Sequence, residues 1–161
     1  MKRVLLKLSG EALAGEKKTG FDEATCIGVA KQVKTLVDQG IQVAIVTGGG
    51  NFWRGRTSET IDRTKADQIG MLATVMNCIY VSDIFRFVGM ETEVYTPFVC
   101  GAFTKLFSKD AATEAMNNGK VVFLSLIHIC KADACTGFDG TDRILSDFFI
   151  AAQGGVPSVS L

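Results

Sequence analysis

Lys7, Ser9 and Gly10 are the first residues along the chain whose types and spacing suit phosphate chemistry. Lys7 lies near the end of a short apolar segment, Arg3–Leu8, and Ser9 and Gly10 follow it directly. This pattern predicts a β-strand followed by a Ser-Gly turn. At the carboxyl end of such a strand, an ammonium group can neutralise a phosphate while a hydroxyl and a backbone N–H donate hydrogen bonds. The pattern alone leaves a second interpretation open, a surface lysine at a strand end.

Three consecutive glycines, Gly48–Gly50, are the second candidate, and they closely follow the apolar segment Ile41–Val46. Successive glycines let the backbone approach a ligand and point several N–H groups at phosphate oxygens. Arg54 can add a bidentate contact to the same oxygens. The segment has neither the Gly-Lys-Ser/Thr ending of a P-loop nor the GxGxxG spacing of a Rossmann fold. The order of elements favours a phosphate-binding loop over a simple flexible turn.

Asp67, expected to open a long helix, is the third candidate. Its carboxylate could accept hydrogen bonds from sugar hydroxyls. An acidic side chain in the first turn also interacts favourably with the helix dipole, and residue type alone favours that structural role.

The chain offers no recognisable metal site. His128, Cys130 and Cys135 provide three ligands without CxxC spacing. The segment Asp139–Asp142 lacks the regular acidic alternation of a calcium-binding EF-hand. We therefore expect no metal ion held by the protein itself.

Strands and helices alternate along the sequence, and this order positions the candidates. Apolar segments predict strands at Arg3–Leu8, Ile41–Val46, Glu93–Phe98 and Lys120–Leu126. Periodicity predicts helices at Phe21–Gly40, Ala66–Val88 and Lys109–Asn118. The alternation indicates a mainly parallel sheet with helices on both faces, and it places Lys7 and Gly48–Gly50 at the carboxyl ends of adjacent strands.

Some apolar side chains have predicted positions within this fold. The long helix is expected to gather an apolar side from Ile69, Leu72, Ala73, Met76, Ile79 and Tyr80. Five phenylalanines are expected in the core because no basic residues are interleaved with them: Phe85, Phe87, Phe98, Phe103 and Phe107.

Composition limits the class of protein. The 161 residues are 47% hydrophobic and 21% charged, as in a folded globular domain. Basic and acidic residues both number 17, and this balance argues against binding to nucleic acid or an anionic membrane. No apolar run has the length of a membrane span, and the first 20 residues lack a signal-peptide layout. Five scattered cysteines fit free thiols in a reducing cytosol, so we expect a cytoplasmic protein.

Three segments resemble the signature blocks of bacterial uridylate (UMP) kinases, in the same order and with the same spacing. They are Lys7–Leu13 (KLSGEAL), Gly48–Gly55 (GGGNFWRG) and Asp67–Asn77 (DQIGMLATVMN). UMP kinases belong to the amino acid kinase superfamily, in which aspartate and acetylglutamate kinases have different first blocks. The resemblance covers residues 1–123 and implies a three-layer α/β/α fold with a mainly parallel sheet.

This resemblance also implies roles for the candidate residues. Family members transfer the γ-phosphoryl group of ATP to UMP in pyrimidine biosynthesis, with Mg²⁺ carried by the nucleotide. Lys7 and Arg54 would be catalytic, and UMP would contact Gly49 and Asp67. ATP would contact Lys7, Leu8, Ser9, Gly10, Gly50 and Arg54. Lysine, arginine and backbone amides suffice for a reaction driven by in-line positioning and charge neutralisation.

Regulation and assembly are further implications of the resemblance. Gly15–Gly20 corresponds to a segment implicated in activation by GTP in many members, and UTP is a second possible effector. Full-length members form homohexamers, and the region Asp67–Val88 is an expected source of contacts between subunits.

The resemblance ends after Phe123. UMP kinases continue there with a glycine-rich loop and a Thr-Thr-Asp-like segment that closes on UMP, whereas this chain has Leu124–Ile129 (LSLIHI). The transposase-adapter DNA CTG TCT CTT ATA CAC ATC encodes the same six residues. We therefore interpret residues 1–123 as the N-terminal part of an amino acid kinase domain, with the UMP-binding half and the ATP phosphate site. Residues 124–161 are interpreted as a chimeric tail, the alternative being a genuine apolar strand with one histidine.

Two other functions stay open beside a truncated UMP kinase that is inactive as this fragment. One is a nucleotide- or phosphate-binding α/β fragment without catalysis. The other is a different kinase of the superfamily, acting on a carboxylate or a carbamate.

Overall fold

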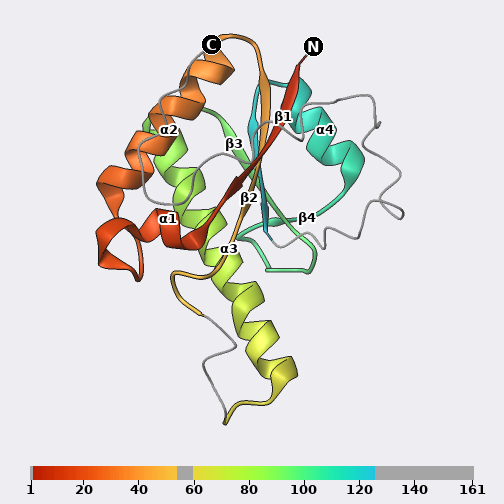
Figure 1. Cartoon of the computed structure of the whole chain (residues 1–161). Coiled ribbons are helices and arrows are strands. Elements are labelled where there is room, and N and C mark those ends of the chain that lie inside the picture. The colour runs from red at the N-terminus through yellow and green to blue at the C-terminus, as the bar shows by residue number, and fades with distance from the viewer. Residues whose placement is uncertain (1, 54–59, 126–161) are drawn as a thin grey trace.

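Parallel strands form the centre of this protein, and helices cover both faces of the sheet, as the sequence predicts (Figure 1). The structure, a computed structural model, describes residues 2–53 and 60–125. Along the chain the elements are β1 (Arg3–Leu8), α1 (Gly10–Ala14), the 3₁₀ turn η1 (Gly15–Lys17), α2 (Glu23–Asp38), β2 (Gln42–Thr47), α3 (Arg63–Phe87), β3 (Thr92–Thr96), β4 (Lys105–Leu106), α4 (Lys109–Asn117) and β5 (Val121–Ser125).

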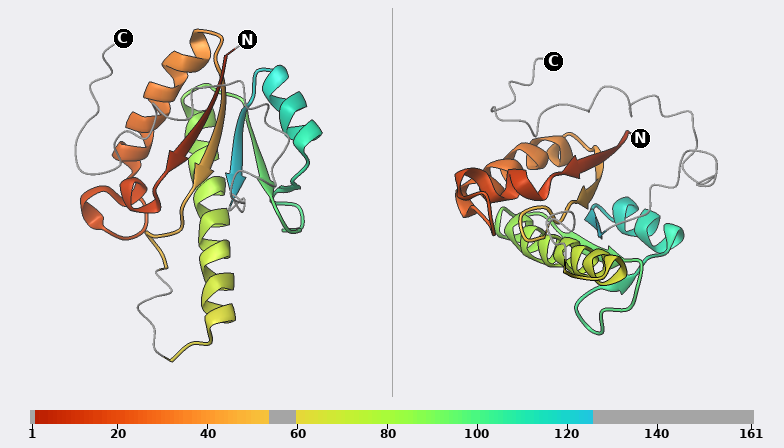
Figure 2. Two further views of the ribbon diagram at one scale, coloured as in Figure 1. Left: turned by 45° about the vertical axis from the view of Figure 1, so that its right-hand side comes forward. Right: turned by 60° about the horizontal axis from the view of Figure 1, so that its bottom comes forward.

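The strand order is β1-β2-β5-β3-β4, and each neighbouring pair is parallel. Figure 2 shows α2 and α3 on one side of the sheet and α4 on the other. The two-residue strand β4 and the short helix α1 were not predicted from the sequence. A mainly parallel three-layer arrangement was predicted, and it is confirmed for the described residues.

Local sequence explains where the helices begin and end. The side chain of Asp22 caps α2 by accepting a hydrogen bond from the Thr25 N–H at 2.9 Å. A glycine with a positive φ angle follows the C-terminal end of each of α2, α3 and α4, namely Gly40, Gly89 and Gly119. Glycine adopts this left-handed conformation without the steric cost of a Cβ atom, so each helix can stop and turn into the next strand.

The larger core lies between the sheet and the helices α2 and α3. Phe123 of β5 and Phe85 of α3 are fully buried there and meet edge to face, with ring centroids 5.0 Å apart. Val122 and Leu124, which point to the other face of β5, pack with residues of α4. Leu124 and Ser125 complete β5 as buried residues.

The predicted apolar side of α3 is only partly buried: Ala73 is buried, and Tyr80 packs against the larger core. The buried residues of the helix are Ala66, Ala73, Thr74, Val75, Asn77, Cys78, Val81, Ser82 and Phe85. Four residues of the predicted stripe remain exposed in this chain: Ile69, Leu72, Met76 and Ile79. The buried side of α3 thus combines small and polar side chains with the larger Val81 and Phe85.

The core prediction for the phenylalanines holds only for Phe85. Phe87, at the end of α3, and Phe103, between β3 and β4, are 78% and 79% exposed. Phe107 is also exposed, and Phe98 is half-buried. These side chains follow or connect regular elements, where no second layer covers them.

By length and composition alone, α3 could cross a membrane. A core helix of a folded domain meets the same criteria, and here α3 contacts β2, β3 and β5 along its buried side.

Candidate phosphate-binding site

The first two candidate segments meet at one edge of the sheet, as predicted. Strands β1 and β2 run parallel, and their last residues, Leu8 and Thr47, are register partners. Directly beyond them, the Gly48 N–H donates to the Leu8 carbonyl at 2.9 Å. Ser9–Gly10 and Gly48–Gly50 therefore lie side by side at the carboxyl ends of adjacent strands, where open α/β sheets bind their ligands.

Gly10 is required by the close approach of these two loops. A Cβ atom on Gly10 would lie 2.8 Å from the Gly50 nitrogen and 2.9 Å from the Gly48 carbonyl oxygen. Both atoms belong to the backbone and cannot move aside as a flexible side chain would. The two loops therefore present their backbones together as one surface.

Ser9 has a local structural role in addition to its predicted one. Its hydroxyl oxygen accepts a hydrogen bond from the Glu11 N–H at 3.2 Å and so caps α1. The hydroxyl proton is still available, because a serine hydroxyl is one donor as well as an acceptor. Ser9 can thus cap its own helix and donate to a phosphate oxygen.

Gly49 and Gly50 face two different neighbours. A Cβ atom on Gly49 would lie 2.9 Å from the Ala73 side chain and 3.0 Å from the Gly70 carbonyl oxygen, both in α3. A Cβ atom on Gly50 would instead lie 3.3 Å from a carboxylate oxygen of Glu11, in α1. The glycine loop therefore fills the space between α1 and α3 and turns one residue toward each.

Asp67 does not open its helix, which corrects the sequence-based expectation. The cap of α3 is Asp62, whose carboxylate accepts hydrogen bonds from the Thr64 and Lys65 N–H groups at 3.1 and 3.3 Å. Asp67 is the fifth residue of α3, so the favourable first-turn position belongs to other residues. Its exposed carboxylate lies 3.4 Å from the Arg63 guanidinium.

The position of Asp67 nevertheless agrees with a shared site. Residues three apart on a helix lie on the same side, so Asp67 and Gly70 are neighbours on the surface of α3. The Gly70 carbonyl faces Gly49 of the glycine loop. Lys7 is exposed near the end of β1. Arg54, the remaining predicted contact, lies outside the described residues.

A buried pair of amides beside the loop was not predicted from the sequence. Asn51 directly follows the three glycines, and Asn77 lies in the middle of α3. Their side chains exchange hydrogen bonds of 2.7 and 3.1 Å. An asparagine within a helix is unfavourable unless it serves some other contact, and this was the one available signal.

The thiol nearest the loop is not a reactive group. Cys78 of α3 lies 3.1 Å from the Thr47 hydroxyl, and its burial raises the pKa to about 12. Burial likewise raises the pKa of Cys26 to about 11. Both thiols stay protonated at neutral pH, which excludes them as nucleophiles there. The chemistry of this edge is that of backbone N–H groups, Lys7 and Asp67.

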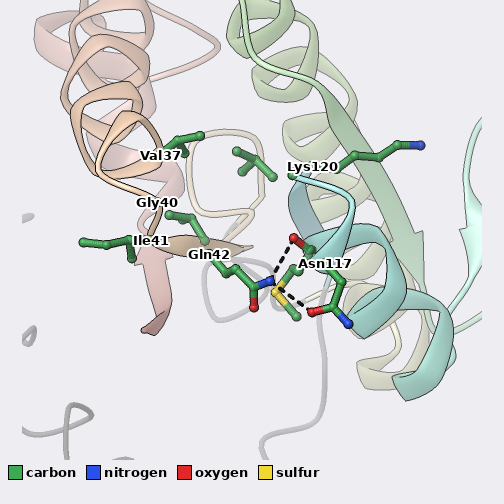
Figure 3. A pocket seen from close by; sticks show the side chains of 10 residues that line it. Val37, Gly40, Ile41, Gln42, Asn117 and Lys120 are labelled. Carbon is green, nitrogen blue, oxygen red and sulfur yellow. Dashed lines mark hydrogen bonds between the residues drawn. The ribbon is translucent and has the colours of Figure 1, made fainter. Parts of the chain in front are cut away.

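A pocket lies away from this candidate site, at the opposite end of the strands (Figure 3). Gln42, the first residue of β2, donates there to the Met116 carbonyl at 3.1 Å and to the Asn117 side chain at 3.0 Å. The Arg3 guanidinium in turn donates to the side-chain oxygen (Oε1) of Gln42 at 2.6 Å. These polar groups satisfy one another, so this pocket is a structural junction between the amino ends of the strands and α4.

Known proteins resemble this chain in sequence and in fold. The sequence profile described as the amino acid kinase family matches residues 2–152. A uridylate kinase of Phocaeicola vulgatus is 45% identical over 126 residues, covering 77% of this chain and 53% of that relative. UMP kinase structures from Bacillus anthracis and Ureaplasma parvum match with TM-scores of 0.73 and 0.72, at 35% and 26% identity. The two matches cover 77% and 78% of this chain, and 52% and 56% of the respective UMP kinase chains.

Two facts about extent follow from these matches. The chain spans about half the length of the relatives it matches. The profile match also runs past residue 123, where the sequence predicts the end of the family-like region. Residues 126–161 lie outside the described residues, so that boundary stays a prediction. The family profile matches most of this chain, and the fold matches those of the UMP kinase structures. The chain therefore belongs to the amino acid kinase family.

Proposed function

We propose that this chain is the N-terminal half of a kinase that transfers the γ-phosphoryl group of ATP to UMP, forming ADP and UDP in pyrimidine biosynthesis. One observation carries the proposal. Ser9–Gly10 and Gly48–Gly50 form one backbone surface at the carboxyl edge of the sheet, and α3 with Asp67 packs directly against it. The names of the similar proteins supply the substrate.

The geometry supports separate sides for donor and acceptor. Gly50 turns toward α1, beside Ser9 and Gly10, which are the expected contacts of the ATP phosphates. Gly49 turns toward α3, which carries Asp67, the expected contact of the UMP sugar. Adjacent residues of one loop would thus hold the two substrates at the short distance that in-line transfer requires.

Charge neutralisation would complete the chemistry. Lys7 is exposed near the carboxyl end of β1, where its ammonium group would balance the negative charge that moves between the two nucleotides. Arg54 is expected to assist from the segment after the glycine loop. Mg²⁺ would arrive as part of the ATP complex. In residues 2–53 and 60–125, no group of three or more His, Cys, Asp or Glu side chains is placed to hold an ion.

Two alternatives compete with this function. A phosphate-binding fragment without catalysis would keep the glycine loop but transfer nothing. A kinase for a carboxylate or carbamate would use the same donor side and a different acceptor. The similarity of the acceptor block Asp67–Asn77 to UMP kinases favours UMP over both.

The same family likeness extends the proposal to assembly and regulation. The exposed stripe of α3, consisting of Ile69, Leu72, Met76 and Ile79, would contact another subunit in a homohexamer. GTP and UTP would act as effectors, with Gly15–Gly20 as the responding segment. We place the protein in the cytoplasm, without nucleic-acid or membrane partners.

Nuclear magnetic resonance titration of this chain tests the proposed substrates. ATP with Mg²⁺ should shift the backbone amide signals of Ser9, Gly10 and Gly50, and UMP should shift those of Gly49 and of Asp67–Thr74. Aspartate, N-acetylglutamate and carbamate should shift none of them. Shifts caused by one of these carboxylates or by carbamate, in the absence of any response to UMP, would support the alternative kinase instead.

A further inference from the structure

The buried amides of Asn51 and Asn77 join three segments that are far apart in the sequence. They connect the glycine loop, the middle of α3 and the segment before α2. Asn51 is 2% exposed and Asn77 is fully buried. Buried amides are costly unless they are paired, so such a pair needs a reason within the fold.

Every N–H of the two side chains has an acceptor. The Asn77 amide nitrogen donates to the Gly48 carbonyl at 2.5 Å and to the Asn51 side-chain oxygen at 2.7 Å. The Asn51 amide nitrogen donates to the Gly20 carbonyl at 2.8 Å and to the Asn77 side-chain oxygen at 3.1 Å. The network is therefore closed, and its geometry fixes the backbone groups at its ends.

Asn51 also binds the segment before α2 through its main chain. Its carbonyl oxygen accepts hydrogen bonds from the Thr19 hydroxyl at 3.1 Å and from the Gly20 N–H at 3.2 Å. With the side-chain bond to the Gly20 carbonyl, three hydrogen bonds tie Thr19–Gly20 to the residue that ends the glycine run. Any change in this segment would reach the loop directly.

The network also adjoins the first phosphate-binding turn. A Cβ atom on Gly10 would lie 2.5 Å from the Asn51 side-chain oxygen. The amide of Asn51 thus fills the space behind Gly10, while Asn77 holds the carbonyl of Gly48 from the other side. Both turns of the candidate site rest on the same pair of side chains.

We propose that Asn51 and Asn77 are positioning residues, a buried amide clamp that sets the direction of the Gly49 and Gly50 N–H groups toward phosphate. The inference rests on the proposed function, because it assigns these N–H groups to nucleotide phosphates. Neither side chain touches the substrates in this account. Their effect on binding passes through the shape of the Gly48–Gly50 loop.

Gln42 provides a matched control. It is also a buried amide that joins distant segments, but it lies at the amino end of β2, at the opposite end of the strand from the glycine loop. Gln42→Ala and Asn77→Ala should lower the thermal unfolding midpoint to a similar degree, because each leaves buried partners without hydrogen bonds. They should differ in their effects on the nucleotide site.

The test compares amide hydrogen exchange and nucleotide affinity in this chain. Without nucleotide, Asn51→Ala and Asn77→Ala should each speed exchange by about tenfold at Gly20 and Gly48, whose N–H groups donate to the Asn51 and Leu8 carbonyls, whereas Gln42→Ala should not. Each of the two variants should also weaken ATP and UMP binding by about tenfold. The double variant should bind little worse than either single variant, since both break the same network.

The outcomes separate the clamp from the proposed function. Unchanged exchange in the loop of Asn77→Ala, or equal loss of affinity in Gln42→Ala, overturns the clamp. If a completed protein, in which residues 1–123 are followed by the C-terminal half of the Phocaeicola vulgatus uridylate kinase, binds neither ATP nor UMP, the proposed function is refuted, and the exchange measurement still decides whether the clamp exists. If Asn77→Ala does not fold, Asn77→Ser retains one donor toward Gly48 and should give an intermediate exchange rate.

Discussion

Gly10 and Lys7 act in different ways at the same edge of the sheet. Gly10 matters because it has no side chain, so the two turns can approach within backbone contact. Lys7 is expected to matter through its charge, which it carries on an exposed side chain near the end of β1. The first residue shapes the surface and the second sets its potential, and substitutions at the two positions should fail differently.

Lys7→Ala and Asp67→Asn should separate turnover from acceptor binding. The measurement uses a completed protein, in which residues 1–123 are followed by the C-terminal half of the Phocaeicola vulgatus uridylate kinase. Lys7→Ala should lower kcat by about a hundredfold, because it removes a cation that stabilises the transferring phosphoryl group. Asp67→Asn should mainly raise the KM for UMP, by about tenfold, because a sugar hydroxyl loses a charged acceptor.

Steady-state kinetics with a second ion pair as control checks this prediction. Lys34 and Asp38 pair at 2.9 Å on the surface of α2, and Lys34→Ala and Asp38→Asn should leave both constants unchanged. A normal kcat in the Lys7→Ala enzyme would show that Lys7 has no role in phosphoryl transfer.

Cysteine reactivity provides a second prediction for single residues. At pH 8, iodoacetamide should modify Cys100 at least about tenfold faster than Cys26 or Cys78, because only the thiolate reacts. Cys100 is half-buried, whereas the other two thiols are fully buried with pKa values raised to about 11 and 12. Mass spectrometry of peptides from the folded chain measures the rates, and unfolding in urea should abolish the difference. Equal rates before unfolding would contradict the burial of these thiols.

The sequence predicted some residues of the site and not others, for a physical reason. Lys7 lies near the end of an apolar strand and Gly10 and Gly48–Gly50 follow such strands, and these positions can be read from neighbouring residues. The amide clamp joins residues 20, 48, 51 and 77, and no local pattern predicts a contact across such distances. Asp67 was expected in the first turn of its helix because the cap at Asp62 was not recognised.

At the scale of elements, the three strands at the far side of the sheet share one charged junction. Glu93 of β3 forms ion pairs with Lys105 of β4 and with Lys120, just before β5. Burial opposes the ionisation of Glu93, but hydrogen bonds from the two lysines outweigh it and hold its pKa below the ordinary value. Glu93 therefore stabilises the fold as a carboxylate.

The sign of the pH effect follows from this lowered pKa. Protonating Glu93 costs more free energy in the folded state than in the unfolded chain. The contribution of Glu93 to stability is therefore present above its pKa in the unfolded chain, about 4.3, and is lost as the pH falls through its pKa in the folded state. Glu93→Gln should lower the free energy of unfolding at pH 7. Between pH 6 and pH 3, the variant should lose less of this free energy than the unmodified chain does. Urea unfolding at each pH measures this, and parallel losses in both proteins would contradict the role of the junction.

The elements themselves were easier to predict than their orientation. Gly40, Gly89 and Gly119 each follow the end of a helix. A glycine after a helical pattern is a local signal, because it can be read from neighbouring residues. Much of the buried face of α3 was missed because small and polar residues such as Thr74, Asn77 and Ser82, which contribute little to a hydrophobic pattern, form part of it. Burial there depends on close packing against the sheet, which single-sequence periodicity does not contain.

At the scale of the whole molecule, the outer strand β1 is less covered than its neighbour β2. The strand lies at the edge of the sheet, and its residues are half-buried or exposed, whereas β2 is buried at all but one position. The relatives are about twice as long as the matched region. We expect this chain alone to assemble poorly into a defined hexamer, because exposed apolar surface that would meet the remaining half favours nonspecific association.

Charge on the exposed stripe of α3 should disrupt the proposed hexamer. Leu72 and Met76 are 54% and 46% exposed in this chain. In the completed protein, Leu72→Glu or Met76→Glu would bury a carboxylate in the subunit contact and should shift the assembly to smaller species. Light scattering measures the mass, and Lys34→Glu on α2 is the control. A hexamer that persists in both stripe variants would exclude α3 as the contact.

Formation of UDP tests the central claim most directly. The completed protein, with ATP, Mg²⁺ and UMP in a coupled assay, should produce UDP steadily. The 161-residue chain should produce no appreciable UDP, because residues 1–123 provide the phosphate contacts and the Asp67 side of the acceptor without the loop that closes on UMP. A completed protein that binds ATP but does not phosphorylate UMP would contradict the proposed function, and robust UDP formation by the 161-residue chain would contradict the interpretation of residues 124–161.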